Sequence, residues 1–345
     1  MKFNNIYKGK TILVTGHTGF KGSWLCIWLE KLGANVIGYS NGMFRNDYIF
    51  KNSMLADKIK SYYGDIRNYR KLHEVAMETK PDFIFHLAAQ ALVRKSYDNP
   101  LETYTTNSIG TTTVLEIIKN CDFIKGGVFI TSDKCYMNIE KDEGYREEDR
   151  VGGIDPYSSS KACAEIIIET YKKSILKEKF IASVRAGNVI GGGDFSEDRL
   201  IPDCIRAIQN NETLIVRFPN ATRPWQHVLE PLSGYLLVGQ KLLEGDKKVC
   251  QAWNFGPEIE SVITVKDVIS KITNNVIYNE QETNKHECIK LSLNIDKAKI
   301  LLGWKPKWNV NTAIKKTVDW YNRAYRKENV YNLCLEQIGE YSKNE

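Results

Sequence analysis

Thr15–Gly22 reads TGHTGFKG, and this glycine turn decides the fold. Before it, Lys10–Thr15 is apolar and β-branched, as expected of a short buried strand. After it, apolar residues recur at helical spacing, and Gly33 is placed to end that helix. A second strand is predicted over Asn35–Tyr39. Strand, turn, helix and strand together have the length of a dinucleotide-binding unit.

The three glycines of the turn have separate tasks. Gly16 allows the tight turn, Gly19 lets the backbone approach a diphosphate, and Gly22 lets the helix pack on the strand. The positive end of the helix then faces the phosphates. Thr18 and Phe20 lie between these glycines, and we expect both to contact the cofactor. A glycine turn without a ligand is the alternative, but the flanking elements favour a nucleotide.

Composition excludes several classes of partner. The chain has 345 residues, of which 42% are hydrophobic and 26% charged, as in ordinary globular proteins. Its net charge of +6 comes from Lys residues scattered among Asp and Glu, so no basic cluster predicts nucleic-acid binding. No apolar run suits export or a membrane span. The eight cysteines lie far apart, which argues against zinc and disulfides. We expect no metal, no membrane partner and a cytoplasmic location.

Strands and helices alternate through the first half of the chain. Strands are predicted at Pro81–Leu87, Gly127–Ser132 and Ile181–Arg185, and helices at Asn107–Lys119 and Tyr157–Ile175. This alternation predicts an α/β fold with a Rossmann-type, doubly wound parallel sheet.

A smaller domain is predicted to follow. We expect residues 1–186 to form the dinucleotide-binding domain, with a later segment near 223–260 returning to it. Residues 187–345 are expected to form mainly a discontinuous substrate-binding domain, because loops rich in Gly, Asn, Asp and Pro begin near Gly187. A helix is predicted at Val310–Tyr325.

Two groups of residues are predicted to be catalytic. Tyr157 and Lys161 lie four apart on a helix and share a face, so a Lys cation, together with the positive nicotinamide ring of an oxidised cofactor, can favour the phenolate and lower the tyrosine pKa. Lys161 can also hold the nicotinamide ribose. Ser132, Asp133 and Lys134 follow a strand, where open α/β sites lie. An adjacent acid and base suit loss of water better than simple alcohol oxidation. A loop ion pair between Asp133 and Lys134 is the alternative.

With these motifs, the chain resembles the CDP-glucose 4,6-dehydratases of the extended short-chain dehydrogenase/reductase superfamily, from about Gly9 to Tyr321. Gln90 and Lys134 stand where related thymidine-nucleotide dehydratases have Glu. The other matching pieces are Thr15–Gly22, His86–Gln90, Thr131–Tyr136, Asp155–Lys161, Arg185–Asp194, Arg199–Asp203 and Arg223–Pro231.

The resemblance implies a lyase that dehydrates CDP-glucose in deoxysugar and O-antigen synthesis. Tyr157 would deprotonate the glucosyl 4-hydroxyl, oriented by Ser132, while hydride leaves carbon 4 for NAD. Asp133 would protonate the departing 6-hydroxyl and Lys134 would assist proton removal at carbon 5. Hydride then returns to carbon 6, which gives the 4-keto-6-deoxy sugar nucleotide. A homodimer or homotetramer is expected.

Ligand-binding residues are also predicted from the resemblance. Asn188 and Arg223 match positions that hold the nucleotide-sugar diphosphate. For Arg199 and Arg217 a solvated surface Arg is the alternative, and for His227 a core histidine. The predicted substrate residues are Gln90, Asn188, Arg199, Arg217, Arg223 and His227. The predicted cofactor residues, besides those of the turn and the Tyr/Lys pair, are Ser40, Asp65, Ile66, Leu87, Ala88 and Ala89.

The residues alone leave some choices open. Tyr39–Asn41, at the end of the second strand, lacks the carboxylate typical of NAD sites, so only the resemblance favours NAD over NADP. A sugar-nucleotide epimerase or reductase would need Tyr157 and Lys161 but not Asp133 with Lys134. A non-catalytic dinucleotide-sensing regulator would be expected to have lost the Tyr/Lys pair.

Overall fold

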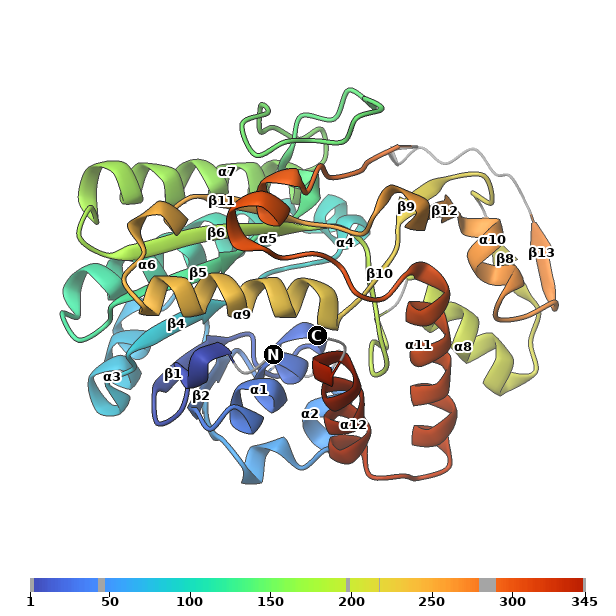
Figure 1. Cartoon of the computed structure of the whole chain (residues 1–345), viewed down its shortest axis with the longest axis horizontal. Coiled ribbons are helices and arrows are strands. Elements are labelled where there is room, and N and C mark those ends of the chain that lie inside the picture. Colours follow the sequence, from blue (N-terminus) through green and yellow to red (C-terminus); the bar gives the residue numbers. More distant parts are fainter. Residues whose placement is uncertain (1–2, 43–46, 197–198, 217, 279–289, 344–345) are drawn as a thin grey trace.

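The structure is a computed structural model, and it describes residues 3–42, 47–196, 199–216, 218–278 and 290–343. At its centre is a seven-stranded sheet in the order β11-β6-β5-β4-β1-β2-β3, and all of its pairs are parallel (Figure 1). These strands are Thr11–Thr15 (β1), Asn35–Ser40 (β2), Lys60–Tyr63 (β3), Phe83–His86 (β4), Gly126–Ile130 (β5), Phe180–Ala186 (β6) and Ala252–Phe255 (β11). The predicted Rossmann-type sheet is therefore confirmed.

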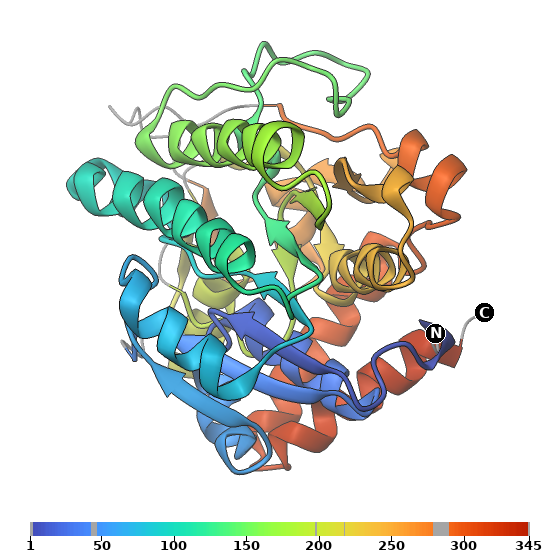
Figure 2. The same cartoon turned by 90° about the vertical axis from the view of Figure 1, so that its left-hand side faces the viewer.

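Helices cover both faces of this sheet, as Figure 2 shows. One hydrophobic cluster lies beneath α3, α6 and α7, and a larger one joins α1, α9 and the C-terminal helices to the other face. The helices of this part are Phe20–Lys31 (α1), Tyr48–Asn52 (α2), Tyr69–Thr79 (α3), Val93–Asp98 (α4), Pro100–Tyr104 (α5), Gly110–Asn120 (α6), Pro156–Thr170 (α7) and Leu229–Leu243 (α9).

The glycine turn between β1 and α1 is as tight as the sequence predicts. Gly16 has a φ of +74°, and a Cβ there would lie 2.8 Å from the backbone nitrogen of Ala88. A Cβ on Gly22 would lie 2.1 Å from the carbonyl oxygen of Gly16, so only glycine lets α1 begin this close to the turn. Gly33, with a φ of +81°, follows the last turn of α1 as expected.

The second half of the chain builds smaller elements beside the sheet's carboxyl edge and also contributes to the Rossmann part. Helix α9 packs on β5 and β6, and β11 extends the sheet beyond β6. The remaining elements are Val189–Ile190 (β7), Leu200–Asn210 (α8), Leu214–Val216 (β8), Thr222–Pro224 (β9), Gln226–His227 (β10), Val262–Thr264 (β12), Val265–Ser270 (α10), Val276–Tyr278 (β13), Val310–Tyr325 (α11) and Val330–Lys343 (α12). The domain boundaries remain a prediction.

Two local differences separate the structure from the sequence-based elements. A π-helical turn at Thr105–Ile109 precedes α6, and a second one at Tyr171–Ile175 ends the helix that begins at Pro156. Only one C-terminal helix, Val310–Tyr325, was predicted from the sequence. The structure adds α12, which packs on α1 and α11.

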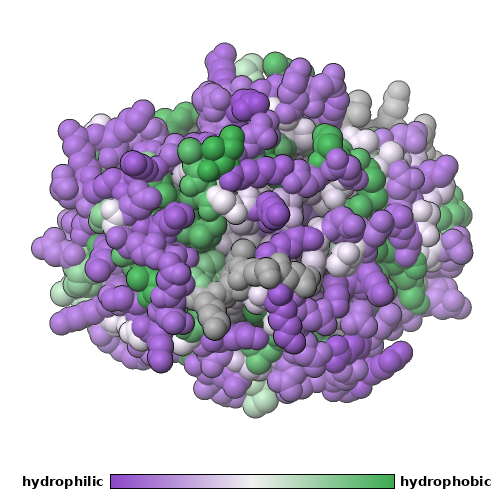
Figure 3. Space-filling model, in the orientation of Figure 1, coloured by the Kyte–Doolittle hydropathy of each residue, from purple (hydrophilic) through white to green (hydrophobic). Residues whose placement is uncertain are grey.

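The face that Figure 3 shows carries no extended hydrophobic patch. Its hydrophobic residues form separate small patches among hydrophilic ones. None of the described helices is long and apolar enough to cross a bilayer. Within the described ranges, no three His, Cys, Asp or Glu side chains group as a metal site would require.

A buried carboxyl on α9 ties the C-terminal helix to the Rossmann part. Glu230 is 0% exposed and accepts hydrogen bonds from the Tyr341 hydroxyl at 2.6 Å and from the N–H groups of Lys307 and Trp308 at 3.0 and 2.7 Å. Burial raises the pKa of Glu230 to about 7, against the effect of these three donors. The folded protein therefore binds this proton more tightly than the unfolded chain, whose Glu pKa is about 4.3.

Stability should consequently fall as pH rises from about 4.5 to about 7, by on the order of 3 kcal/mol from this group, and then level off. We expect the Tm of wild type to fall relative to the Tm of Glu230→Gln by several degrees between pH 5 and pH 8, because Gln does not titrate. Glu244→Gln, on an exposed turn after the same helix, is the control. A difference that stays constant with pH would show that Glu230 does not titrate in this range.

Candidate active site

A cavity of about 960 Å³ lies beyond the carboxyl ends of β5 and β6, where open α/β sheets bind ligands. It collects residues from α1, the β5 and β6 ends, α7 and the smaller elements. Seven of the predicted site residues line it: Ser132, Asp133, Lys134, Tyr157, Asn188, Arg199 and Arg223. Three of these are cations and one is a buried carboxyl, so the cavity suits an anionic ligand next to an acid.

The segment after β5 turns sharply into the cavity. Strand β5 ends at Ile130, two residues earlier than predicted, and Asp133–Cys135 forms a single 3₁₀ turn. The Ser132 hydroxyl accepts a hydrogen bond from the Lys134 N–H at 3.2 Å and donates one to Asp133 Oδ1 at 2.9 Å. Burial raises the pKa of Asp133, while Lys134 and the Ser132 hydroxyl oppose this. A carboxyl that holds its proton is suited to general-acid work.

Helix α7 presents Tyr157 and Lys161 on one face, as predicted. Asp155 caps the helix by accepting from the Ser158 N–H at 2.9 Å, and Pro156 occupies its first position. Lys161 Nζ donates to the Ile130 carbonyl oxygen at 3.2 Å, and burial lowers its pKa to about 8.

In the protein without a cofactor, the pKa of Tyr157 is raised, so the predicted lowering is wrong for this state. Burial raises the pKa of Tyr157 to about 12, and the Ser132 hydroxyl only partly offsets this. The physical reason is that the phenol is only 8% exposed, so a phenolate there would lose most of its hydration.

A buried ion pair lies beneath the site. Burial would raise the pKa of Glu165, but Arg185, at 2.7 Å, and neighbouring hydroxyls hold it below its usual value. Thr131 Oγ1 donates to Glu165 from the residue before Ser132, and Arg185 Nη1 donates to the Tyr136 hydroxyl at 2.7 Å. The segment that carries Asp133 is thus fixed on both sides by one charged pair.

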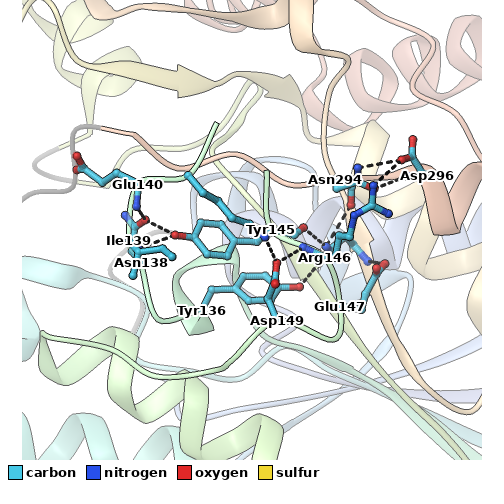
Figure 4. A network of polar contacts seen from close by, with 12 residues as sticks. Tyr136, Asn138, Ile139, Glu140, Tyr145, Arg146, Glu147, Asp149, Asn294 and Asp296 are labelled. Carbon is cyan, nitrogen blue, oxygen red and sulfur yellow. Dashed lines mark hydrogen bonds and ion pairs between the residues drawn. The ribbon is translucent and has the colours of Figure 1, made fainter. Parts of the chain in front are cut away.

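The loop that follows the Asp133–Cys135 turn is also fixed (Figure 4). The Tyr145 hydroxyl donates to Asn138 Oδ1 at 2.7 Å and accepts from the Ile139 N–H at 2.6 Å. The Asn294 N–H donates to the Tyr145 carbonyl at 2.9 Å, and Arg146 pairs with Asp296 at 3.3 Å. These contacts anchor the loop to the segment before α11.

The residues predicted to hold a dinucleotide fit one. Gly19 caps α1 without a side chain, and a Cβ there would meet only the Gly16 carbonyl oxygen, at 3.4 Å, so a phosphate can approach the helix end. At the end of β2, Ser40 Oγ is buried and has no hydrogen-bond partner among the described residues. Such an orphaned hydroxyl can bond a ribose where the usual carboxylate is missing. Asp65 itself pairs with Arg67 at 2.5 Å.

The remaining cofactor residues lie at neighbouring strand ends. Leu87, Ala88 and Ala89 follow β4, and the Ala88 N–H donates to Thr15 Oγ1 at 3.2 Å. This bond holds the backbone beside the glycine turn. Ile66 is buried against α6, where a Cβ on Gly110 would meet it at 2.7 Å.

Two predicted substrate residues, Gln90 and His227, are not brought to the cavity. The Gln90 side chain instead bonds the backbone of Leu92 at 2.7 and 3.0 Å and Thr103 Oγ1 at 3.0 Å, so it organises its own loop. His227 is 0% exposed, and its ring lies 4.9 Å from the Trp308 ring. Its geometry matches the alternative, a core histidine. Arg217 lies outside the described residues.

Two residues with evident roles were missed. Asn107 Nδ2 donates to the Gln90 carbonyl at 3.0 Å and to Ser160 Oγ at 2.8 Å, so it clamps the loop after β4 to α7. Only its place in a π-helical turn, which the sequence did not reveal, marks it out. Lys21, within the glycine turn itself, lines the cavity. The available signal was one Lys inside a stretch, Thr11–Leu29, that has no other Lys, Arg, Asp or Glu.

Comparisons with known proteins agree with this architecture. A family model described as GDP-mannose 4,6 dehydratase matches residues 13–317. The CDP-glucose 4,6-dehydratase of Salmonella typhimurium is 44% identical, over 98% of this chain and 97% of the relative. The UDP-glucose 4-epimerase of Rhizobium meliloti is 26% identical, over 92% and 98%.

Solved structures show the same fold. An epimerase from Methanothermobacter thermautotrophicus has a TM-score of 0.81 and 26% identity, covering 94% of this chain and 96% of that one. The dTDP-glucose 4,6-dehydratase of Bacillus anthracis, in complex with NAD, has a TM-score of 0.78 and 24% identity, covering 92% and 98%. The family model matches most of this chain, and the sheet, the glycine turn and the helix with Tyr157 and Lys161 are all present. The chain therefore belongs to the GDP-mannose 4,6 dehydratase family of sugar-nucleotide enzymes.

Proposed function

We propose that this chain dehydrates CDP-glucose to the 4-keto-6-deoxy sugar nucleotide, with NAD as its cofactor. The relative at 44% identity supports the reaction and the substrate. The observation that carries the proposal is the buried Asp133, with a raised pKa, in the same cavity as Tyr157. An alcohol dehydrogenase or an epimerase needs the tyrosine but does not need a second acid beside the sugar.

Each residue has one task in the proposed reaction. The Ser132 hydroxyl orients the 4-hydroxyl of the sugar, and Tyr157 takes its proton. NAD, held by the glycine turn and Lys161, would supply the hydride acceptor for carbon 4 and the hydride donor for carbon 6, and its positive ring would favour the phenolate. Asp133 gives its proton to the departing 6-hydroxyl, and Lys134 assists removal of the proton from carbon 5, which the 4-ketone has made acidic. Carbon 5 regains a proton from water when hydride reaches carbon 6. Asn188, Arg199 and Arg223 line the cavity where the diphosphate is proposed to bind.

Isotope labels test this reaction. CDP-glucose deuterated at carbon 4 is expected to give a 4-keto product labelled at carbon 6, and reaction in heavy water is expected to label carbon 5. Mass spectrometry and NMR of the product distinguish the two positions. A keto product that keeps its 6-hydroxyl while reduced cofactor accumulates would indicate an ordinary dehydrogenase. Inversion at carbon 4 without loss of water would indicate an epimerase.

Other features remain predictions from the sequence. The seven described cysteines are all free thiols, which supports the proposed cytoplasmic location. A homodimer or homotetramer and a role in O-antigen synthesis are proposed from the resemblance alone.

A further inference from the structure

Lys21 places a charge in the cavity that the proposed reaction does not use. It is the second residue of α1, so its backbone belongs to the glycine turn while its side chain lines the same cavity as Asp133 and Tyr157. Gly16, Thr18 and Gly19 of the turn are not part of that lining. The side chain therefore reaches away from the dinucleotide side of the turn and toward the substrate side.

Two other cations of the cavity lining form ion pairs with carboxylates. Arg199 pairs with Asp194 at 3.0 Å, and Lys95, another lysine of the lining, pairs with Glu102 at 3.5 Å. Among the described residues, no carboxylate forms an ion pair with Lys21. The charges that act on it are Arg199 and Lys161, which repel it, and Asp133 and Asp194, which attract it.

The charged form of the Lys21 side chain is consequently destabilised by its surroundings. Burial is the largest effect, followed by repulsion from Arg199, and together they lower the pKa of Lys21 to about 8 although Asp133 and Asp194 oppose them. A bound anion would restore the charged form. The anion that fits a cavity lined by Asn188, Arg199 and Arg223 is a diphosphate.

We propose that Lys21 binds the diphosphate of the nucleotide sugar and so links the cofactor-binding helix to the substrate. This proposal rests on the function proposed above and adds a specificity-determining residue to it. One ammonium on α1 would then contact substrate directly, while the backbone of the same turn holds the dinucleotide.

A proton linkage is expected from the lowered pKa of Lys21. With a pKa of about 8, some of the Lys21 side chains carry no proton at pH 8, and a bound diphosphate raises the pKa, so we expect binding to take up protons at this pH. At pH 6.5 nearly all of them are already protonated, and this uptake disappears. Lys161 has a similar pKa, so the uptake is assigned to Lys21 only by a variant.

Calorimetric titration with CDP and with CMP, at pH 8 in buffers of different ionisation enthalpy, tests the proposal. Lys21→Met is expected to weaken CDP binding ~10-fold or more, to weaken CMP binding less than ~3-fold, and to abolish the proton uptake. Lys21→Arg should restore CDP affinity to within ~3-fold. Lys95→Met, which changes a paired lysine of the same cavity, should leave the CDP to CMP affinity ratio unchanged.

Three results would overturn the proposal. In the first, Lys21→Met weakens NAD binding and leaves CDP unchanged, which would assign the ammonium to the cofactor diphosphate. In the second, CDP and CMP weaken equally. In the third, neither changes although thermal unfolding shows a folded variant. Label transfer from carbon 4 to carbon 6 in wild type tests the proposed function separately, because these titrations need no turnover.

Discussion

Tyr157→Phe is expected to lower product formation by ~10³-fold, within the range for loss of an acid–base group, while the fold is retained. Only the phenolic oxygen is lost, and the ring keeps its buried position at the start of α7. The backbone N–H of this residue still donates to Ser96 Oγ, at 3.1 Å. Product formation and thermal unfolding measured on the same preparation would check both halves of the expectation.

Tyr235→Phe is a matched control for this prediction. Tyr235 is 0% exposed, and its hydroxyl is buried without a hydrogen-bond partner among the described residues, so its removal leaves no partner unsatisfied. We expect activity to change less than ~3-fold. Activity within that limit for Tyr157→Phe as well would remove Tyr157 from the reaction.

Features that depend on residues close together in the sequence could be predicted. The glycine turn and the Tyr157–Lys161 pair depend on residues within one turn of each other, where spacing alone fixes which side chains share a face. The parallel sheet followed from the alternation of buried strands with helices. Ser132–Lys134 could be placed at the sheet edge that holds the cavity, because strand ends of a parallel sheet converge on one edge, while its catalytic role stays a prediction.

The features that depend on residues distant in the chain could not be predicted. Arg185 and Glu165 meet across 20 positions, and only the fold brings their charges beneath Thr131. The same holds for the burial that raises the pKa of Tyr157. His227 matched a family motif. However, Trp308, which is 81 positions later in the chain, packs against the His227 ring and places this residue in the core. Motifs identify residue types, whereas burial decides what those residues do.

Asp133→Asn is expected to separate oxidation at carbon 4 from loss of the 6-hydroxyl. Asparagine has the same shape and can still accept the hydrogen bond from Ser132, but it has no carboxyl proton to give. Dehydration should therefore fall by ~100-fold or more, the usual scale for a general acid. Oxidation, which needs Tyr157, should persist. Rapid mixing with CDP-glucose should show reduced nicotinamide by its absorbance while little 6-deoxy product forms.

The packing of Asp133 makes this substitution a strict test. Its Oδ2 lies so close to the backbone after β6 that a Cβ on Gly187 would approach it to 2.9 Å, so the carboxyl is closely packed on this side. Asp203→Asn is the control, since Asp203 lines the same cavity but forms a partly exposed pair with Arg206. Little change in either half-reaction is expected there. Equal losses of oxidation and dehydration in Asp133→Asn, with the control unaffected, would show that Asp133 holds the segment in place and does not donate a proton. The acid would then have to be another group of the cavity.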